Sequence, residues 1–89
     1  MAALPAPQLA DAGDVGRFIL ECVPRAKGSC AEANAVYERF EQWCQAERLS
    51  PLEPREFAVA FSAWCNRAGI RARRDDGRYV YFLDVKLAS

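Results

Sequence analysis

The chain has 89 residues, 52% of them hydrophobic and 27% charged, which suits a single domain with one core and excludes a disordered polypeptide. Twelve Lys/Arg balance twelve Asp/Glu, so the protein as a whole is not a strongly basic nucleic-acid binder. The charges are nevertheless polarised. Residues 1–53 carry five basic and eight acidic residues (net −3), whereas residues 54–89 carry seven and four (net +3).

The four cysteines, Cys22, Cys30, Cys44 and Cys65, are irregularly spaced, and the chain has no histidine. No Cys-x-x-Cys pair occurs, so neither a metal site nor a cofactor is expected. Cys22, Cys44 and Cys65 lie on or beside predicted apolar helix faces, and we expect them to be reduced core thiols in a cytoplasmic protein. A catalytic Ser-His or Cys-His pair and a phosphate-binding glycine loop are both missing, which predicts that the protein is not an enzyme. No apolar run reaches transmembrane length, so no membrane partner is expected.

Residues 1–13 are rich in Ala and Pro and are predicted to be a flexible leader, with one folded domain over residues 14–89. Asp14 is placed to cap a first helix over residues 15–22, which Pro24 ends.

Residues 24–28 are predicted to form a loop, whose two cations either contact a nucleic-acid backbone or are simply solvated. Ser29 and Glu32 have the spacing of a capping box, which predicts a second helix from there to about Glu47. The residues expected to be buried by this helix follow helical spacing: Ala33, Val36, Tyr37, Phe40, Trp43 and Cys44.

The third helix is predicted over residues 54–68, with Pro54 in its first turn and Gly69 at a left-handed C-terminus. A short strand in the preceding turn, residues 49–52, could pair with the hairpin that follows the helix. The face of the third helix expected to be buried consists of Phe57, Phe61, Trp64 and Ala68.

Two extended runs, residues 70–74 and 79–87, flank the turn sequence Asp75-Asp76-Gly77-Arg78 and predict a β-hairpin. The predicted fold is therefore mainly α with a small β-hairpin, an α+β class. Three helices followed by a hairpin wing form a compact winged helix-turn-helix.

The opposite face of the third helix combines small and polar side chains, which let a helix lie close to the floor of the DNA major groove. Ser62 and Asn66 are candidates for base contacts, and Arg55 and Arg67 for contacts with DNA. Asn66 could bond an adenine, or it could simply be a residue favoured near a helix C-terminus.

Four arginines surround the turn of the hairpin: Arg71, Arg73, Arg74 and Arg78. They suit a wing on the phosphate backbone, and the alternative is a charged edge strand that resists aggregation.

Several segments resemble one family. They are Phe-Ile-Leu-Glu-Cys at 18–22, Ala-Val-Tyr-Glu-Arg-Phe-Glu-Gln-Trp-Cys at 35–44, Pro-Leu-Glu-Pro-Arg-Glu-Phe at 51–57, Ala-Gly-Ile-Arg-Ala-Arg-Arg at 68–74, then Gly77-Arg78 and Tyr81. Together they resemble the winged-helix domain at the C-terminus of primase-helicases from phages, plasmids and large DNA viruses. The resemblance covers residues 15–83, and its most specific part is the Tyr-to-Trp-Cys segment.

The resemblance implies DNA binding at a replication origin or primer site. Carried onto this sequence, it places the contacts at Arg55, Ser62, Asn66, Arg67, Arg71, Arg73, Arg74 and Arg78. Family members carry this domain behind a helicase ATPase, which is not found here, and Glu53 stands where they have a serine. The chain is then either a piece of a larger protein or a stand-alone replication accessory factor, small repressor or DNA mimic.

The expected partner is double-stranded DNA, or alternatively single-stranded DNA, bound by a monomer or a weak homodimer. The main alternative is a winged helix that binds a replication helicase or a defence protein without binding DNA. Its docking surface would be the acidic second helix or the Tyr/Phe strand of the hairpin. A redox or metal-binding protein is the third alternative.

Overall fold

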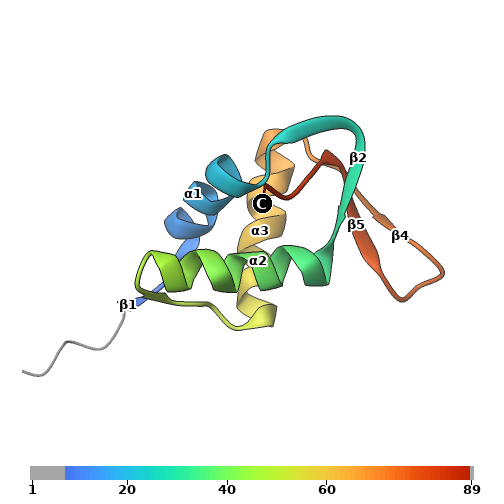
Figure 1. Ribbon diagram of the computed structural model, residues 1–89. Coiled ribbons are helices and arrows are strands. Elements are labelled where there is room, and N and C mark those ends of the chain that lie inside the picture. Colours follow the sequence, from blue (N-terminus) through green and yellow to red (C-terminus); the bar gives the residue numbers. More distant parts are fainter. Residues whose placement is uncertain (1–7, 89) are drawn as a thin grey trace, which may run out of the picture.

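The computed structural model describes residues 8–88, which form three helices and a small antiparallel sheet (Figure 1). This confirms the predicted α+β class. The elements in chain order are β1 (Gln8–Leu9), α1 (Ala12–Cys22), β2 (Arg25–Glu32), α2 (Ala33–Ala46), β3 (Leu49–Ser50), α3 (Pro54–Ala68), β4 (Ala72–Arg74) and β5 (Val80–Val85). Among these residues no helix has both the length and the apolar content needed to cross a bilayer.

The bounds of α3 agree with the sequence prediction. Pro54 occupies the first turn, where its missing N–H has no partner to lose, and Gly69 ends the helix in the left-handed region with φ of +72°. The buried face differs by one position from the prediction. Phe57, Phe61 and Cys65 are buried, whereas Trp64 is half-buried and Ala68 is exposed.

The beginning of α1 corrects two predictions. Asp11, not Asp14, is the N-cap: its carboxylate accepts from the Asp14 N–H at 2.9 Å, and the Asp14 carboxylate accepts from the Asp11 N–H at 3.0 Å. The leader prediction is wrong for residues 8–13, since β1 pairs in parallel with β3 and Ala10 is buried. The rest of the predicted leader, residues 1–7, lies outside the described residues.

The largest correction concerns the segment between α1 and α2. Neither a loop at residues 24–28 nor a capping box from Ser29 is present, because the segment forms β2, the first strand of the sheet. Glu32, at the end of β2, is the true N-cap of α2, and its carboxylate accepts from the Ala35 N–H at 3.2 Å. In chain order a strand therefore separates the first two helices, and α2 ends at Ala46.

The three-stranded sheet has the order β2-β5-β4, with both neighbouring pairs antiparallel. Residues 49–52 do not pair with the hairpin, since β3 pairs with β1 instead. Near the base of the sheet Asp84 adopts φ of +57°, and its carboxylate accepts from the Gly28 N–H at 2.9 Å. This irregularity interrupts the alternation of β5, so that Phe82 and Val85 are both buried although they are three residues apart.

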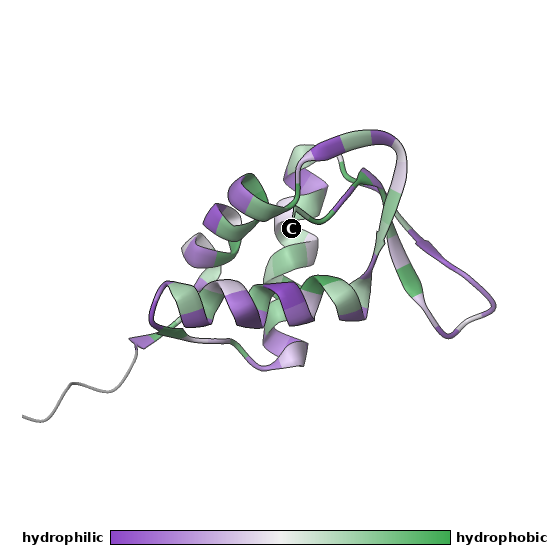
Figure 2. Cartoon of the chain, viewed as in Figure 1, coloured by the Kyte–Doolittle hydropathy of each residue, from purple (hydrophilic) through white to green (hydrophobic). Residues whose placement is uncertain are grey.

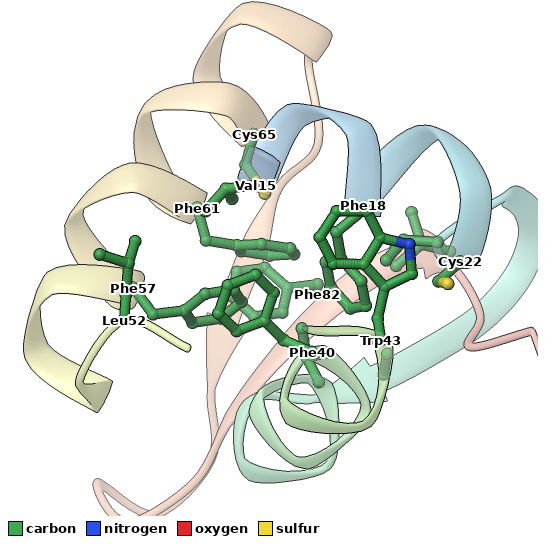
Figure 3. Packing of buried hydrophobic residues seen from close by; sticks show 14 of the residues in the cluster. Val15, Phe18, Cys22, Phe40, Trp43, Leu52, Phe57, Phe61, Cys65 and Phe82 are labelled. Atoms are coloured by element: carbon green, nitrogen blue, oxygen red, sulfur yellow. The ribbon is translucent and has the colours of Figure 1, made fainter. Parts of the chain in front are cut away.

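Aromatic rings connect the helices to the sheet (Figure 3). Phe40 of α2 lies 4.4 Å from Phe57, measured between ring centroids, and Phe57 lies 5.3 Å from Phe61 on the same helix. Phe61 in turn contacts Phe82 of β5 at 4.7 Å. This continuous row fixes the hairpin against α3, because edge-to-face and offset rings gain energy beyond the area that they bury.

Other expected core positions agree with the structure. Val36, Phe40, Trp43 and Cys44 are buried, although Ala33 and Tyr37 are only half-buried. Hydrophobic residues accordingly lie where the helices face one another, and hydrophilic ones line their outer sides and the hairpin tip (Figure 2). The Tyr37 hydroxyl donates to the Leu52 carbonyl at 2.6 Å and so holds the turn before α3.

Candidate nucleic-acid interface

The exposed face of α3 is set by its buried face. Because Phe57, Phe61 and Cys65 face the core, Val59, Ser62 and other residues on the far side of the helix face solvent. Val59 is 70% exposed, unusually open for a large apolar side chain. The other exposed residues of this face are Arg55, Ala63 and Asn66.

A groove runs between α3 and the hairpin strand β4. It consists of two adjoining hollows of about 480 and 550 Å³ that share Ser62, Ala72 and Phe82. Arg74 lines the first hollow, and Asn66 and Arg71 line the second. The structure thus brings Ser62 and Asn66, the predicted base contacts, next to two of the predicted phosphate contacts.

The hairpin turn is held by Asp75. Its N–H donates to the Tyr79 carbonyl at 2.9 Å, and its carboxylate accepts from the Tyr79 N–H at 3.0 Å. Gly77 has φ of +85°, as the Asp-Gly turn sequence predicts. Arg78 lies in this turn, whereas Arg73 lines a hollow on the other face of the sheet, with Cys30, Tyr81 and Leu83. The four hairpin arginines therefore divide between two faces and a tip.

Two predicted contacts lie at the margins of the groove. Arg55 is in the first turn of α3, next to the carboxylates of Glu53 and Glu56. Glu53 is the N-cap residue but makes no side-chain capping bond. These carboxylates repel phosphate at this end of the helix, so the favourable region lies further along α3. Arg67 is turned away from the groove, with its guanidinium 5.5 Å from the centre of the Trp64 ring.

Three of the four arginines outside the interface have internal partners, and Arg48 is the exception within residues 8–88. Arg17 pairs with Asp14, Glu21 and Glu47, and the hydrogen bond to Glu47 raises the pKa of Arg17. Arg25 donates to the Ala68 carbonyl and Arg39 to the Ala88 carbonyl. Because the Arg25 side chain already donates to a backbone carbonyl, it would have to give up that bond to bind phosphate. This argues against the predicted contact between residues 24–28 and a nucleic-acid backbone.

The arginines of the predicted interface, like Arg48, lack such internal partners within residues 8–88. Within residues 8–88, no ion pair or side-chain hydrogen bond involves any of its six arginines: Arg55, Arg67, Arg71, Arg73, Arg74 and Arg78. Solvated guanidinium groups do not have to give up an internal partner when they bind phosphate.

No arrangement in the described part of the chain suits metal binding, since no group of three Cys, Asp or Glu is close enough to hold an ion. The thiols are free. Burial raises the pKa of Cys44 and Cys65 to about 11 and also raises that of Cys22, so these groups are poor nucleophiles at neutral pH.

The sequence did not reveal the outer face of the sheet. Cys30, Tyr81 and Leu83 come together only because β2 joins β5. On β2 the only buried residue is Ala31, so the strand lacks the alternating pattern by which a half-buried strand is recognised.

Comparison of the chain with protein-family models, with curated proteins and with solved structures finds no match to any of them. Function therefore has to be inferred from the residues and their geometry.

Proposed function

We propose that this protein is a winged-helix domain that binds double-stranded DNA, with α3 in the major groove and the hairpin on the backbone. The element order supports this assignment. After α1 the chain runs β2, α2, β3, α3, β4 and β5, and the sheet order β2-β5-β4 leaves the hairpin as a wing beside α3. In helix-turn-helix proteins the second helix of the pair is the one that reads the major groove.

One observation carries the proposal: the groove between α3 and β4 has hydrogen-bonding side chains on one wall and unpaired arginines on the other. Ser62 and Asn66 offer donors and acceptors for base edges. Arg71 and Arg74 stand across the groove and are suited to phosphates. The small residues Ala58 and Ala63 on α3 allow its backbone to approach the bases.

The resemblance to the C-terminal domain of primase-helicases suggests a role in the replication of a phage, plasmid or other mobile element. In that role the domain would hold a replication protein at an origin or primer site. A stand-alone repressor would use the same groove, so this part of the proposal depends on which DNA is bound.

The test is fluorescence anisotropy with a mixed-sequence duplex at several salt concentrations. The logarithm of the binding constant should fall linearly with the logarithm of salt concentration, because phosphate contacts release counterions. The double variant Arg71→Ala/Arg74→Ala should weaken binding on every sequence and reduce the salt slope by about two. Lys27→Ala/Lys86→Ala is the matched control: it removes two exposed positive charges outside the groove and should leave the slope nearly unchanged.

A protein-binding function is the second candidate, favoured by one specific feature. An apolar hollow of about 490 Å³ lies between α1 and α3, lined by Ile19, Leu20 and Trp64 among others, and Leu20 is 86% exposed. This is a different surface from the acidic helix and the Tyr/Phe strand expected from the sequence. A folded protein that fails to bind duplex DNA at low salt would favour this function over DNA binding.

A further inference from the structure

Within residues 8–88, the helices cover the inner face of the three-stranded sheet and leave its outer face open. Its inner face carries Phe82, which is buried against Phe61 of α3, and the half-buried Val80. On the outer face, Cys30, Tyr81 and Leu83 line a shallow hollow of about 260 Å³ whose surface is almost entirely apolar. This surface is separate from the α3–β4 groove.

Two tyrosines, Tyr79 and Tyr81, supply aromatic rings to this face. Tyr79 immediately precedes β5 and Tyr81 is the second residue of the strand. The hydrogen bond from the Asp75 N–H to the Tyr79 carbonyl continues the pairing of β4 with β5 by one residue, so alternation puts both tyrosines on the same face. Tyr79 is 42% exposed, and its backbone is held by two hydrogen bonds with Asp75. The ring of Tyr79 therefore stands on a fixed backbone and has an open surface.

The hairpin that carries the tyrosines has a positive net charge. Arg73 lines the hollow and has no ion pair within residues 8–88. The hairpin as a whole, residues 71–79, contains four arginines against two aspartates, a net charge of +2, and Arg73 is the one of the four that lines this hollow. Asp75 also lines the hollow, and Glu32 lies opposite Tyr81 in the sheet. Both carboxylates accept backbone hydrogen bonds, Asp75 from Tyr79 and Glu32 from the first turn of α2.

We propose that the outer face of the sheet binds single-stranded nucleic acid. Unstacked bases lie on the rings of Tyr79 and Tyr81 and on the apolar hollow beside them, and Arg73 contacts a phosphate. Aromatic rings bind unpaired bases without sequence preference, because every base has a π-face, whereas a base inside a duplex is already stacked on its neighbours. This site is distinct from the proposed duplex site and does not depend on it.

The experiment is anisotropy of dye-labelled (dT)15 and (rU)15 with the full chain at low salt. Tyr79→Leu, which removes the ring but keeps an apolar side chain, should weaken (dT)15 binding about tenfold, since loss of one stacking contact is worth roughly that factor. Tyr79→Trp should retain the wild-type affinity. Equal binding by the wild type and Tyr79→Leu, or no binding of either oligonucleotide, would overturn the proposal. A difference in affinity between (dT)15 and (rU)15 assigns the site to DNA or RNA.

Cys30 provides a second readout, because its exposed thiol lies in the hollow. Saturating (dT)15 should slow alkylation of Cys30 several-fold, and an unchanged rate would argue against occupation of this face. A blunt duplex should leave the rate nearly unchanged.

The two proposals fail separately. Arg71→Ala/Arg74→Ala tests the groove through duplex affinity, and Tyr79→Leu tests the outer face through single-strand affinity. Duplex binding that survives Tyr79→Leu, together with unchanged (dT)15 binding, would remove the outer face and keep the groove. The thermal unfolding midpoint of each variant checks that the fold is intact.

Discussion

The rings of Phe61 on α3 and Phe82 on β5 meet edge to face, with centroids 4.7 Å apart and an interplanar angle of 66°. The two residues are far apart in sequence, and this contact sets where the hairpin stands relative to the exposed face of α3. Both residues line the first hollow of the groove between α3 and β4. The geometry of the proposed DNA site therefore depends on the core beneath it.

Phe82→Ala should lower the free energy of unfolding by about 3–5 kcal/mol, because it leaves a cavity beside Phe61. Urea unfolding followed by circular dichroism measures this change. Val59→Ala is the control, since Val59 is 70% exposed, and it should change the free energy by less than about 0.5 kcal/mol. Equal effects of the two substitutions would mean that Phe82 does not anchor the hairpin.

Gly16→Ala should destabilise the protein although alanine is the better helix former. A Cβ atom at Gly16 would lie 2.6 Å from Cζ2 of Trp64, which crosses α1 and donates its indole N–H to the Ala12 carbonyl at 2.7 Å. Overpacking of this kind costs about 1–3 kcal/mol, and helix propensity returns roughly 1 kcal/mol, so we expect a net loss of up to about 2 kcal/mol.

Thermal unfolding of Gly16→Ala tests this close approach. The same substitution made in a Trp64→Leu background should no longer destabilise, because the indole is absent. A Gly16→Ala protein that is more stable than the wild type would show that α1 and α3 do not approach each other in this way.

Cys30 should be the first thiol to react with iodoacetamide. It is exposed, whereas Cys22, Cys44 and Cys65 are buried. A thiol pKa of about 11 in place of 9.0 leaves Cys44 and Cys65 with roughly a hundredfold less thiolate at pH 8. Mass spectrometry of the native protein should show one adduct, Cys30→Ser should show none, and four adducts should appear in urea.

Stability should decline at alkaline pH. The thiols of Cys44 and Cys65 ionise near pH 9.0 in the unfolded chain and near 11 in the folded protein. Their contribution is therefore complete below pH 9 and is lost as the pH rises towards 11, because the unfolded chain loses its protons first. The raised pKa values of Tyr37 and Tyr81 act in the same direction. Urea midpoints at pH 8 and pH 10.5 measure the loss, and an equal or higher midpoint at pH 10.5 would contradict it.

Val59 should contact a thymine methyl group if α3 reads the major groove. Its exposed side chain stands one turn from Ser62 and Ala63, among the residues suited to base edges. In a duplex selected from a random library, replacing the contacted thymine by uracil removes one methyl group, worth about 0.8 kcal/mol or roughly fourfold in affinity. Val59→Ala should lose this discrimination. Equal sensitivity of the wild type and Val59→Ala to uracil at every position would exclude Val59 as the reader of that methyl.

Local chemistry in the sequence was sufficient for α3 and the hairpin turn. Pro54 and Gly69 mark the ends of α3 because each suits a backbone state found at only one end of a helix. Gly77 supplies the positive φ that the hairpin turn requires. Apolar spacing also identified most of the core, including Phe40 and Phe57, and left Ser62 and Asn66 on the open face.

Tertiary contacts determined the strand β2 and the outer face of the sheet, which the sequence did not predict. The sequence from Ser29 to Glu32 resembles a helix start, but pairing with β5 stabilises it as a strand, since backbone hydrogen bonds across a sheet are not encoded in local spacing. The register of that pairing gathers Cys30, Tyr81 and Arg73 on one outer face. Local propensity selects the elements, and long-range packing selects which of their side chains meet.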